Sequence, residues 1–183
     1  MLAVADGVTR RTLVLGGARS GKSAFAERLA GESATVRYLA TAVLDPADTD
    51  FADRVAGHRA RRPAHWTTVD SADPATVLTA EPGFPGATLV DDLGTWLTAR
   101  IDALDAWDAP RGTVAPAADA LVAAVRDYPG RLVIVSPEVG MGVVPATRSG
   151  RLFRDEIGAL NQALAAVCEE AYLVVAGLPL RLK

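Results

Sequence analysis

The residues best suited to chemistry lie in a glycine-rich stretch near the start of the chain, at positions 16–23. They match the P-loop pattern G-x-x-x-x-G-K-[ST], in which backbone N–H groups wrap a phosphate and the next helix adds partial positive charge. In this pattern Lys22 reaches the β- and γ-phosphates, and the Ser23 hydroxyl is a ligand of Mg²⁺. We therefore predict a nucleotide site at Gly16, Gly17, Ala18, Arg19, Ser20, Gly21, Lys22 and Ser23.

The segments on either side of this loop are those that the motif requires. Residues 12–15 form a short apolar run that is typical of a buried strand. After the loop, apolar residues including Phe25 and Leu29 recur at helical spacing, and Gly31 marks the end of the helix. A glycine-rich turn with a chance lysine is the alternative, and the strand–loop–helix context argues against it.

Two adjacent acids, Asp91 and Asp92, follow the apolar run at residues 87–90. An acid at the end of a buried strand is the Walker-B arrangement, which would hold Mg²⁺ together with Ser23. The alternative is an aspartate that caps the helix beginning at Leu93. We expect one of the two acids to bind the metal and the other to cap the helix, and we assign the metal to Asp91.

A third candidate is the basic stretch at residues 58–63, which has a histidine, three arginines and a proline. Taken alone, it favours a solvated helix end, where cations oppose the negative end of the helix dipole. The other interpretation is a phosphate site, because neutral imidazole attacks phosphoryl groups and neighbouring arginines offset the developing charge. In that case His58 would be the nucleophile of a covalent nucleotidyl transfer.

Composition limits the classes of protein to which the chain can belong. Its 183 residues suit one domain, half of them are hydrophobic, and the net charge of −3 argues against a broad nucleic-acid surface. The single cysteine, Cys168, excludes an intrachain disulfide. No stretch approaches the roughly 20 apolar residues of a membrane helix, so we expect a cytoplasmic protein. Residues 1–11 are expected to be a leader, and 12–183 one catalytic domain.

Apolar strands alternate with amphipathic helices along the whole chain, a pattern that favours an α/β fold with a mainly parallel sheet covered on both faces. Ligands of such sheets bind beyond the carboxyl ends of the strands, where the P-loop, Asp91 and a glycine-rich loop at 136–145 would meet. We predict strands at 12–15, 36–41, 65–69, 87–91, 132–135 and 172–176. The helices are expected after the P-loop and at about 50–62, 74–78, 93–104, 118–128 and 149–170, with a surface loop at 105–116.

The ordered set of motifs resembles one family, the bifunctional adenosylcobinamide kinase / adenosylcobinamide-phosphate guanylyltransferases of cobalamin biosynthesis. The resemblance covers roughly residues 12–183. The motifs that carry it, besides the P-loop, are Tyr38-Leu39-Ala40-Thr41-Ala42, Arg54 with His58-Arg59-Ala60-Arg61-Arg62-Pro63 and Trp66, Asp91-Asp92-Leu93 with Trp96, Glu138-Val139-Gly140 with Gly142 and Val144-Pro145, Arg151 through Gln162, and Ala176-Gly177-Leu178-Pro179-Leu180.

The resemblance implies a three-layer, RecA-like P-loop fold, a homotrimer and two reactions. ATP or GTP phosphorylates the hydroxyl of the aminopropanol arm of adenosylcobinamide, and GMP then passes from GTP through a histidine to adenosylcobinamide phosphate. The matching histidine is His58, which reverses the preference for a solvated helix end. Further nucleotide contacts implied by the resemblance are Ala40, Thr41, Ala42, Arg59, Ala60, Arg61, Arg62, Asp70 and Asp91, with Mg²⁺ at Ser23 and Asp91.

The sequence differs from the family pattern near the expected site. Relatives usually carry Asn at Pro137, a small residue or Cys at Asp92, Thr at Gly94 and Asn at Ala99, and Glu in place of Asp70. Two other functions remain open from the residues. One is a P-loop kinase of another small metabolite, and the other is a nucleotide-dependent switch, which would hydrolyse nucleotide slowly and transfer nothing to a small acceptor.

Overall fold

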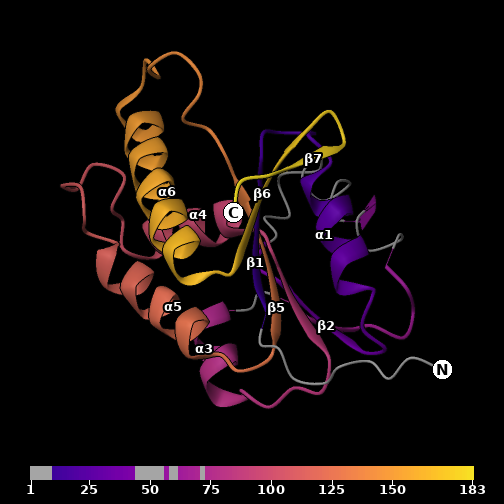
Figure 1. Ribbon diagram of the computed structural model, residues 1–183. Helices are drawn as coiled ribbons and strands as arrows, with labels where there is room; N and C mark the ends of the chain where they lie inside the picture. Colours follow the sequence, from indigo (N-terminus) through magenta and orange to yellow (C-terminus); the bar gives the residue numbers. More distant parts are fainter. Residues whose placement is uncertain (1–9, 44–55, 58–61, 71–72) are drawn as a thin grey trace.

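The computed structural model describes residues 10–43, 56–57, 62–70 and 73–183. Within these residues the centre is a seven-stranded sheet with the order β3-β2-β4-β5-β1-β6-β7 (Figure 1). Neighbouring strands are parallel except for β6 and β7, which form an antiparallel hairpin. The strands are β1 (Arg11–Gly16), β2 (Val36–Ala40), β3 (Thr67–Val69), β4 (Ala87–Asp91), β5 (Arg131–Pro137), β6 (Glu170–Val175) and β7 (Leu178–Arg181).

Helices cover both faces of this sheet, which confirms the predicted three-layer α/β architecture. The helix that follows the P-loop, α1 (Lys22–Ala30), lies on one face (Figure 1). The other face carries α3 (Pro74–Ala80), α4 (Leu93–Ala103), α5 (Ala115–Asp127) and α6 (Arg148–Val167).

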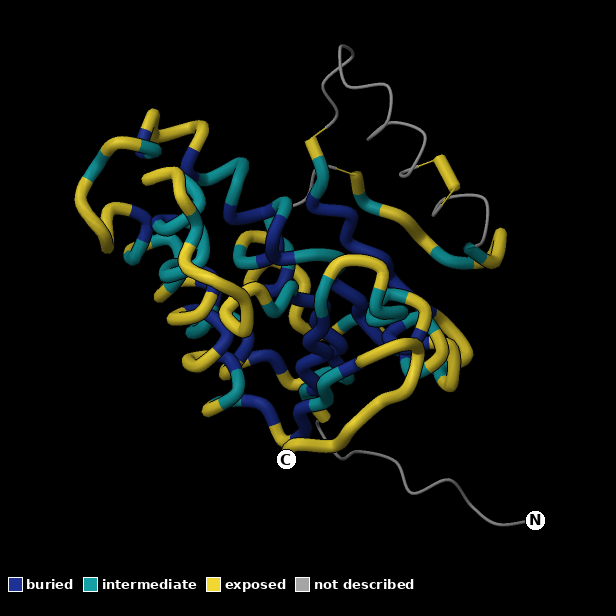
Figure 2. Tube along the Cα trace, turned by 90° about the horizontal axis from the view of Figure 1, so that it is seen from above, coloured by how far each residue is buried: buried dark blue, intermediate teal, exposed yellow. Residues whose placement is uncertain are grey.

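The strands separate two hydrophobic cores because successive side chains point to opposite faces of the sheet. Leu13, Leu39 and Val90 pack with the helices α3 to α6, whereas Val14 and Leu89 pack with α1. Figure 2 shows that the buried residues lie in the interior of the molecule and the exposed ones around the outside. The strands are apolar throughout because both of their faces are covered.

Some boundaries differ from the predicted ones. Helix α5 begins at Ala115, earlier than the predicted start at 118. Its first turn can include Pro116, because the N–H that proline lacks would have no partner within the helix there. Strand β7 was not predicted at all. Ala176 and Gly177, with φ of 51° and 79°, form the two-residue turn that leads into it.

The region between β2 and β4 contains further elements that the sequence predicted. The helix predicted at 74–78 is confirmed as α3, and Asp73 caps it by accepting a hydrogen bond from the Thr76 backbone N–H at 3.3 Å. The strand predicted at 65–69 is confirmed over 67–69 only. The helix predicted at about 50–62 lies mostly outside the described residues. Among the helices described, none has the length and apolar character needed to cross a membrane.

Candidate functional site

The backbone conformation of the P-loop requires glycine at positions 16 and 21. Gly21 has a φ of 92°, in the left-handed region that glycine adopts without strain. A side chain at Gly16 would place its Cβ 2.8 Å from the Val174 carbonyl oxygen, a contact too close for any other residue. Arg19 is exposed and also has a positive φ, of 56°. The loop can therefore turn sharply and present its backbone N–H groups to a phosphate.

Two neighbouring segments hold the P-loop in place. The backbone N–H of Gly177, in the β6–β7 turn, donates to the Ser20 carbonyl at 2.7 Å. The N–H of Glu138, just beyond β5, donates to the Gly16 carbonyl at 3.1 Å. The hairpin that the sequence did not predict thus supports the phosphate loop directly, and Gly177 also passes close to Gly21.

Ser23 and Asp91 meet at the carboxyl edge of the sheet. The Ser23 hydroxyl, in the first turn of α1, donates to Asp91 Oδ1 at 3.1 Å. Asp91 is the last residue of β4, and α1 crosses the sheet face over β4 and β5, which brings the two side chains together. A hydroxyl and a carboxylate are the oxygen ligands that Mg²⁺ favours, so the pair suits this ion.

Tyr38 holds the second oxygen of Asp91, a role that the motifs did not indicate. Its hydroxyl donates to Asp91 Oδ2 at 2.6 Å, and its side chain is almost completely buried. Burial and the neighbouring Asp91 carboxylate raise the pKa of Tyr38 well above its usual value, so the hydroxyl keeps its proton. Asp91 is therefore held between Tyr38 and Ser23.

The Arg62 guanidinium stacks on this tyrosine. Its Cζ lies 3.5 Å from the centre of the Tyr38 ring, a cation–π contact. Trp66 lies beside the same ring, with a centroid separation of 6.4 Å. The end of the basic segment thus lies next to the residue that fixes Asp91.

Asp92 has a different environment from Asp91. Its carboxylate caps α4 by accepting the Thr95 N–H at 3.0 Å, and its Oδ2 lies 4.0 Å from Lys22 Nζ. Its carbonyl accepts a hydrogen bond from the Thr41 hydroxyl at 2.6 Å. Of the two adjacent acids, Asp92 is therefore the one that caps a helix, and Asp91 is the one that faces Ser23.

The remaining residues predicted to contact the nucleotide lie at or just after the carboxyl ends of β2 and β3 or belong to the basic segment at 58–63. Ala40, Thr41 and Ala42 lie at the carboxyl end of β2, beside the end of β4, and Thr41 is buried. Asp70 is exposed and directly follows β3. The structure therefore brings the P-loop, Thr41, Asp91 and Arg62 to one edge of the sheet. His58, Arg59, Ala60 and Arg61 lie outside the described residues.

The carboxyl end of β5 is fixed by a buried polar pair. The Ser136 hydroxyl donates to Asn161 Oδ1 at 2.5 Å, and Asn161 Nδ2 donates to the Pro137 carbonyl at 3.0 Å. Both side chains are buried, so α6 is tied to the strand that lies between the P-loop strand and β4. The pair contributes to positioning Glu138, whose N–H supports the loop.

The chain is similar to characterised proteins along almost its whole length. Residues 12–182 match the family described as cobinamide kinase / cobinamide phosphate guanyltransferase. A bifunctional adenosylcobalamin biosynthesis protein, CobP of Pseudomonas aeruginosa, is 45% identical over 177 residues, with 94% of this chain and 97% of that protein covered. CobU of Salmonella typhimurium, also named a bifunctional adenosylcobalamin biosynthesis protein, is 39% identical, with 93% and 98% covered.

Solved structures support the fold independently. An ATPase from a type III secretion system of pathogenic bacteria superimposes with a TM-score of 0.57 at 12% identity, covering 94% of this chain and 56% of that one. EscN, the type III secretion ATPase of enteropathogenic E. coli, gives a TM-score of 0.54, with 92% and 43% covered. These likenesses concern the P-loop ATPase fold alone. By its motifs and its sequence match, the chain belongs to the cobinamide kinase / cobinamide phosphate guanyltransferase family.

Proposed function

We propose that this protein carries out both reactions named in its family's description. It phosphorylates the free hydroxyl of adenosylcobinamide with ATP or GTP, and it then transfers GMP from GTP to the resulting phosphate. The observation that supports this most strongly is the Ser23–Asp91 contact of 3.1 Å directly beneath a P-loop that carries Lys22. The match over residues 12–182 connects that site to cobinamide.

In the kinase step the acceptor hydroxyl oxygen forms a bond to the γ-phosphorus. The bond between that phosphorus and the β–γ bridging oxygen breaks, the hydroxyl proton leaves, and nucleoside diphosphate is released. Lys22 and the P-loop N–H groups bind the phosphates and stabilise the charge that moves onto the bridging oxygen. Tyr38 keeps the Asp91 carboxylate oriented throughout.

Ser23 and Asp91 are the residues that we propose for Mg²⁺. The ion would supply positive charge beside the β- and γ-phosphates, which lowers the cost of the negative charge that they carry. The contribution of the protein is to hold a hydroxyl and a carboxylate together at the carboxyl edge of the sheet.

In the transfer step we propose His58 as the nucleophile. One imidazole nitrogen forms a bond to the α-phosphorus of GTP, and pyrophosphate leaves. A phosphate oxygen of adenosylcobinamide phosphate then attacks the same phosphorus, the N–P bond breaks, and His58 is regenerated. Supporting this assignment, Arg62 lies on the Tyr38 ring beside Asp91, so the basic segment that contains the histidine ends at the nucleotide site.

The other nucleotide contacts follow the same segments. We assign them to Ala40, Thr41 and Ala42, to Arg59, Ala60, Arg61 and Arg62, and to Asp70. We further propose that residues 12–183 act as one catalytic domain in the cytoplasm, with residues 1–11 as a leader.

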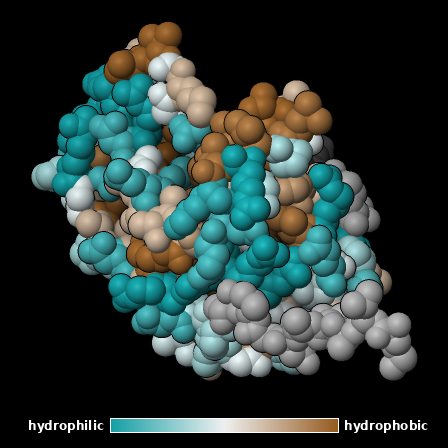
Figure 3. Space-filling view, viewed as in Figure 1, coloured by the Kyte–Doolittle hydropathy of each residue, from teal (hydrophilic) through white to brown (hydrophobic). Residues whose placement is uncertain are grey.

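We also propose a homotrimer. Two hydrophobic projections support it, one on each side of a notch at the top of the view in Figure 3. The first belongs to the β5–α6 loop, where Met141 and Val143 are exposed, and the second to the β6–β7 hairpin with Leu178 and Leu180. Light scattering coupled to size-exclusion chromatography should give three times the chain mass, and a monomer would contradict this proposal.

Product analysis tests the proposed function. With adenosylcobinamide, ATP, GTP and Mg²⁺, mass spectrometry should detect the phosphate ester and then the GDP ester. Lys22→Ala should lose both products, whereas Arg28→Ala, an exposed cation on the same helix, should keep them. Transfer to another hydroxylated metabolite but not to adenosylcobinamide would support a different kinase. Slow hydrolysis without transfer would support a switch.

A further inference from the structure

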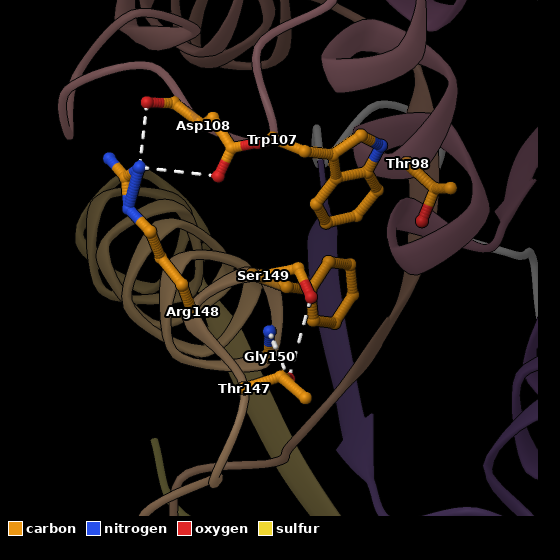
Figure 4. Close-up of a pocket in the computed structure, with 8 residues that line it drawn as sticks. Thr98, Trp107, Asp108, Thr147, Arg148, Ser149 and Gly150 are labelled. Carbon is orange, nitrogen blue, oxygen red and sulfur yellow. Dashed lines mark hydrogen bonds and ion pairs between the residues drawn. The ribbon is translucent and has the colours of Figure 1, made fainter.

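A cavity of about 810 Å³ lies on the face of the sheet opposite α1. Its walls come from α4, the loop after α4 and the start of α6 (Figure 4). The lining residues are Thr98, Trp107, Asp108, Thr147, Arg148, Ser149, Gly150 and Phe153. This volume is in the range of small-molecule sites, roughly 300–1,000 Å³. None of its lining residues belongs to the phosphate site described above.

Two aromatic side chains, Trp107 and Phe153, form the apolar part of the wall. Both are partly buried and rest against the hydrophobic core. The Trp107 indole N–H donates to Asp102 Oδ1 at 2.6 Å, which fixes the orientation of the ring. Fixed aromatic rings of this kind offer apolar surface to a ligand at low entropic cost.

The positive charge of Arg148 in the cavity wall already has partners within the protein. Arg148 donates to the carbonyls of Asp108 and Ala109 at 2.7 and 2.9 Å and pairs with the Asp108 carboxylate at 3.3 Å. No other cation is found among the described residues that line the cavity. The cavity is therefore poorly suited to a phosphate group and better suited to a ligand portion without anionic groups.

The hydroxyl groups in the wall favour a ligand that carries amides. The Thr98 hydroxyl donates to the Gly94 carbonyl at 3.0 Å, so its lone pairs can still accept a hydrogen bond. The hydroxyls of Ser149 and Thr147 lie 3.4 Å apart on the opposite wall (Figure 4). Carboxamides both donate and accept, so they match such groups.

The cavity lies within reach of the phosphate site. Helix α4 begins beside Asp92, whose Oδ2 is 4.0 Å from Lys22 Nζ. Thr98 follows six residues later, about 9 Å along the helix axis at roughly 1.5 Å per residue. Helix α6, the other wall, follows the loop that leaves the carboxyl end of β5. Both walls thus extend from the edge of the sheet that holds the nucleotide site.

We infer that this cavity binds the acceptor, a corrinoid with an apolar macrocycle and amide side chains, while the hydroxyl-bearing arm of that acceptor reaches the phosphate site. The inference rests on the proposed function. It assigns Trp107 and Phe153 to contact the macrocycle edge, and Thr98 and Ser149 to bind amide groups. The nucleotide has no part in this site.

Two variants with opposite effects on the cavity test the inference. Phe153→Ala removes an aromatic wall, and Ser149→Trp fills the space without removing a core atom. Leu104→Ala, exposed near the same loop but not lining the cavity, is the matched control. The readouts are the KM for adenosylcobinamide, the KM for ATP, and the labelling of the protein by GTP without acceptor.

We expect both cavity variants to raise the KM for adenosylcobinamide by about tenfold, corresponding to loss of one good apolar contact. The KM for ATP and labelling by GTP should stay at wild-type levels, as should all values for Leu104→Ala. If Phe153→Ala fails to fold, Ser149→Trp decides the matter. Wild-type acceptor KM in Ser149→Trp would overturn the inference and leave the proposed function standing. A wild-type protein that neither binds nor phosphorylates adenosylcobinamide would overturn both.

Discussion

Asp91 and Asp92 are adjacent in the chain but have different partners at the carboxyl edge of the sheet. Asp91 ends β4 on the side of α1, where Ser23 and Tyr38 contact its two carboxylate oxygens. Asp92 instead caps α4 and accepts the Thr41 hydroxyl on its carbonyl, and its Oδ2 lies 4.0 Å from Lys22 Nζ. One dipeptide therefore supplies both the carboxylate that faces Ser23 and the start of the helix that leads to the cavity.

The largest effect should come from removing the charge of Asp91. Asp91→Asn is expected to lower kinase turnover by about 10²- to 10³-fold, the range seen when one electrostatic group of an active site is lost. Its thermal stability should change little, since the amide keeps a hydrogen bond to Tyr38 or Ser23. Asp92→Asn is the matched substitution and should retain activity within about tenfold. Equal losses at the two positions would contradict the division between them.

A smaller effect on activity is expected for Tyr38→Phe, which keeps the ring under Arg62 and removes only the hydroxyl. Residues that orient a metal ligand typically contribute about 10- to 100-fold to affinity or activity. We expect about a tenfold loss, together with an increase in the Mg²⁺ concentration required for half-maximal rate. A loss of stability with unchanged Mg²⁺ dependence would show that the tyrosine is merely structural.

The stability of the protein should be sensitive to packing at Gly94, in the first turn of the helix that Asp92 caps. Gly94 is buried, and a Cβ added there would lie 2.8 Å from Cγ of Pro137. Gly94→Ala is therefore expected to lower the free energy of unfolding by about 1–2 kcal/mol, because overpacking outweighs the helix propensity of alanine. Denaturant titration of Gly94→Ala, Pro137→Ala and the double variant checks the cause. In the Pro137→Ala background, Gly94→Ala should lower the free energy of unfolding much less than in the wild type. If the effects of the two substitutions simply add, the contact with Pro137 is not the reason for the loss of stability.

The smallest effect is expected from the helix cap. Asp92→Ala should lower stability by about 1 kcal/mol because the Thr95 N–H loses its acceptor. Asp92→Asn should preserve the cap and most of this stability, since asparagine caps helices as well as aspartate does. Thermal unfolding of the two variants makes the comparison, and identical melting temperatures would contradict the capping role.

Much of the fold was predictable because strong local signals agreed. The P-loop pattern, the strand before it and the amphipathic spacing of α6 gave correct elements, and the apolar strands indicated a sheet covered on both faces. The hairpin strand β7 was missed because it is short, exposed and contains Pro179, a residue found in strands mainly at sheet edges.

The site was less predictable where it depends on tertiary contacts. Tyr38 reaches Asp91 because β2 pairs with β4 in the register that sets Ala40 opposite Asp91. That register cannot be read from either strand alone, so the contact between Tyr38 and Asp91 was not predictable. The cavity also arises from three separate segments, and one of them, the 105–116 loop, carries no motif.

Covalent labelling with GTP is the sharpest test of whether one P-loop protein carries out both phosphoryl and guanylyl transfer. The protein is incubated with Mg²⁺ and GTP labelled in its α-phosphate, without acceptor. We predict label held on the protein, stable to alkali and released by acid, and absent in both His58→Ala and Lys22→Ala. The His58→Ala variant should still phosphorylate adenosylcobinamide. Guanylyl transfer through His58 would be excluded by a wild-type protein that binds GTP yet takes up no label, or by a His58→Ala variant that keeps full guanylyl transfer.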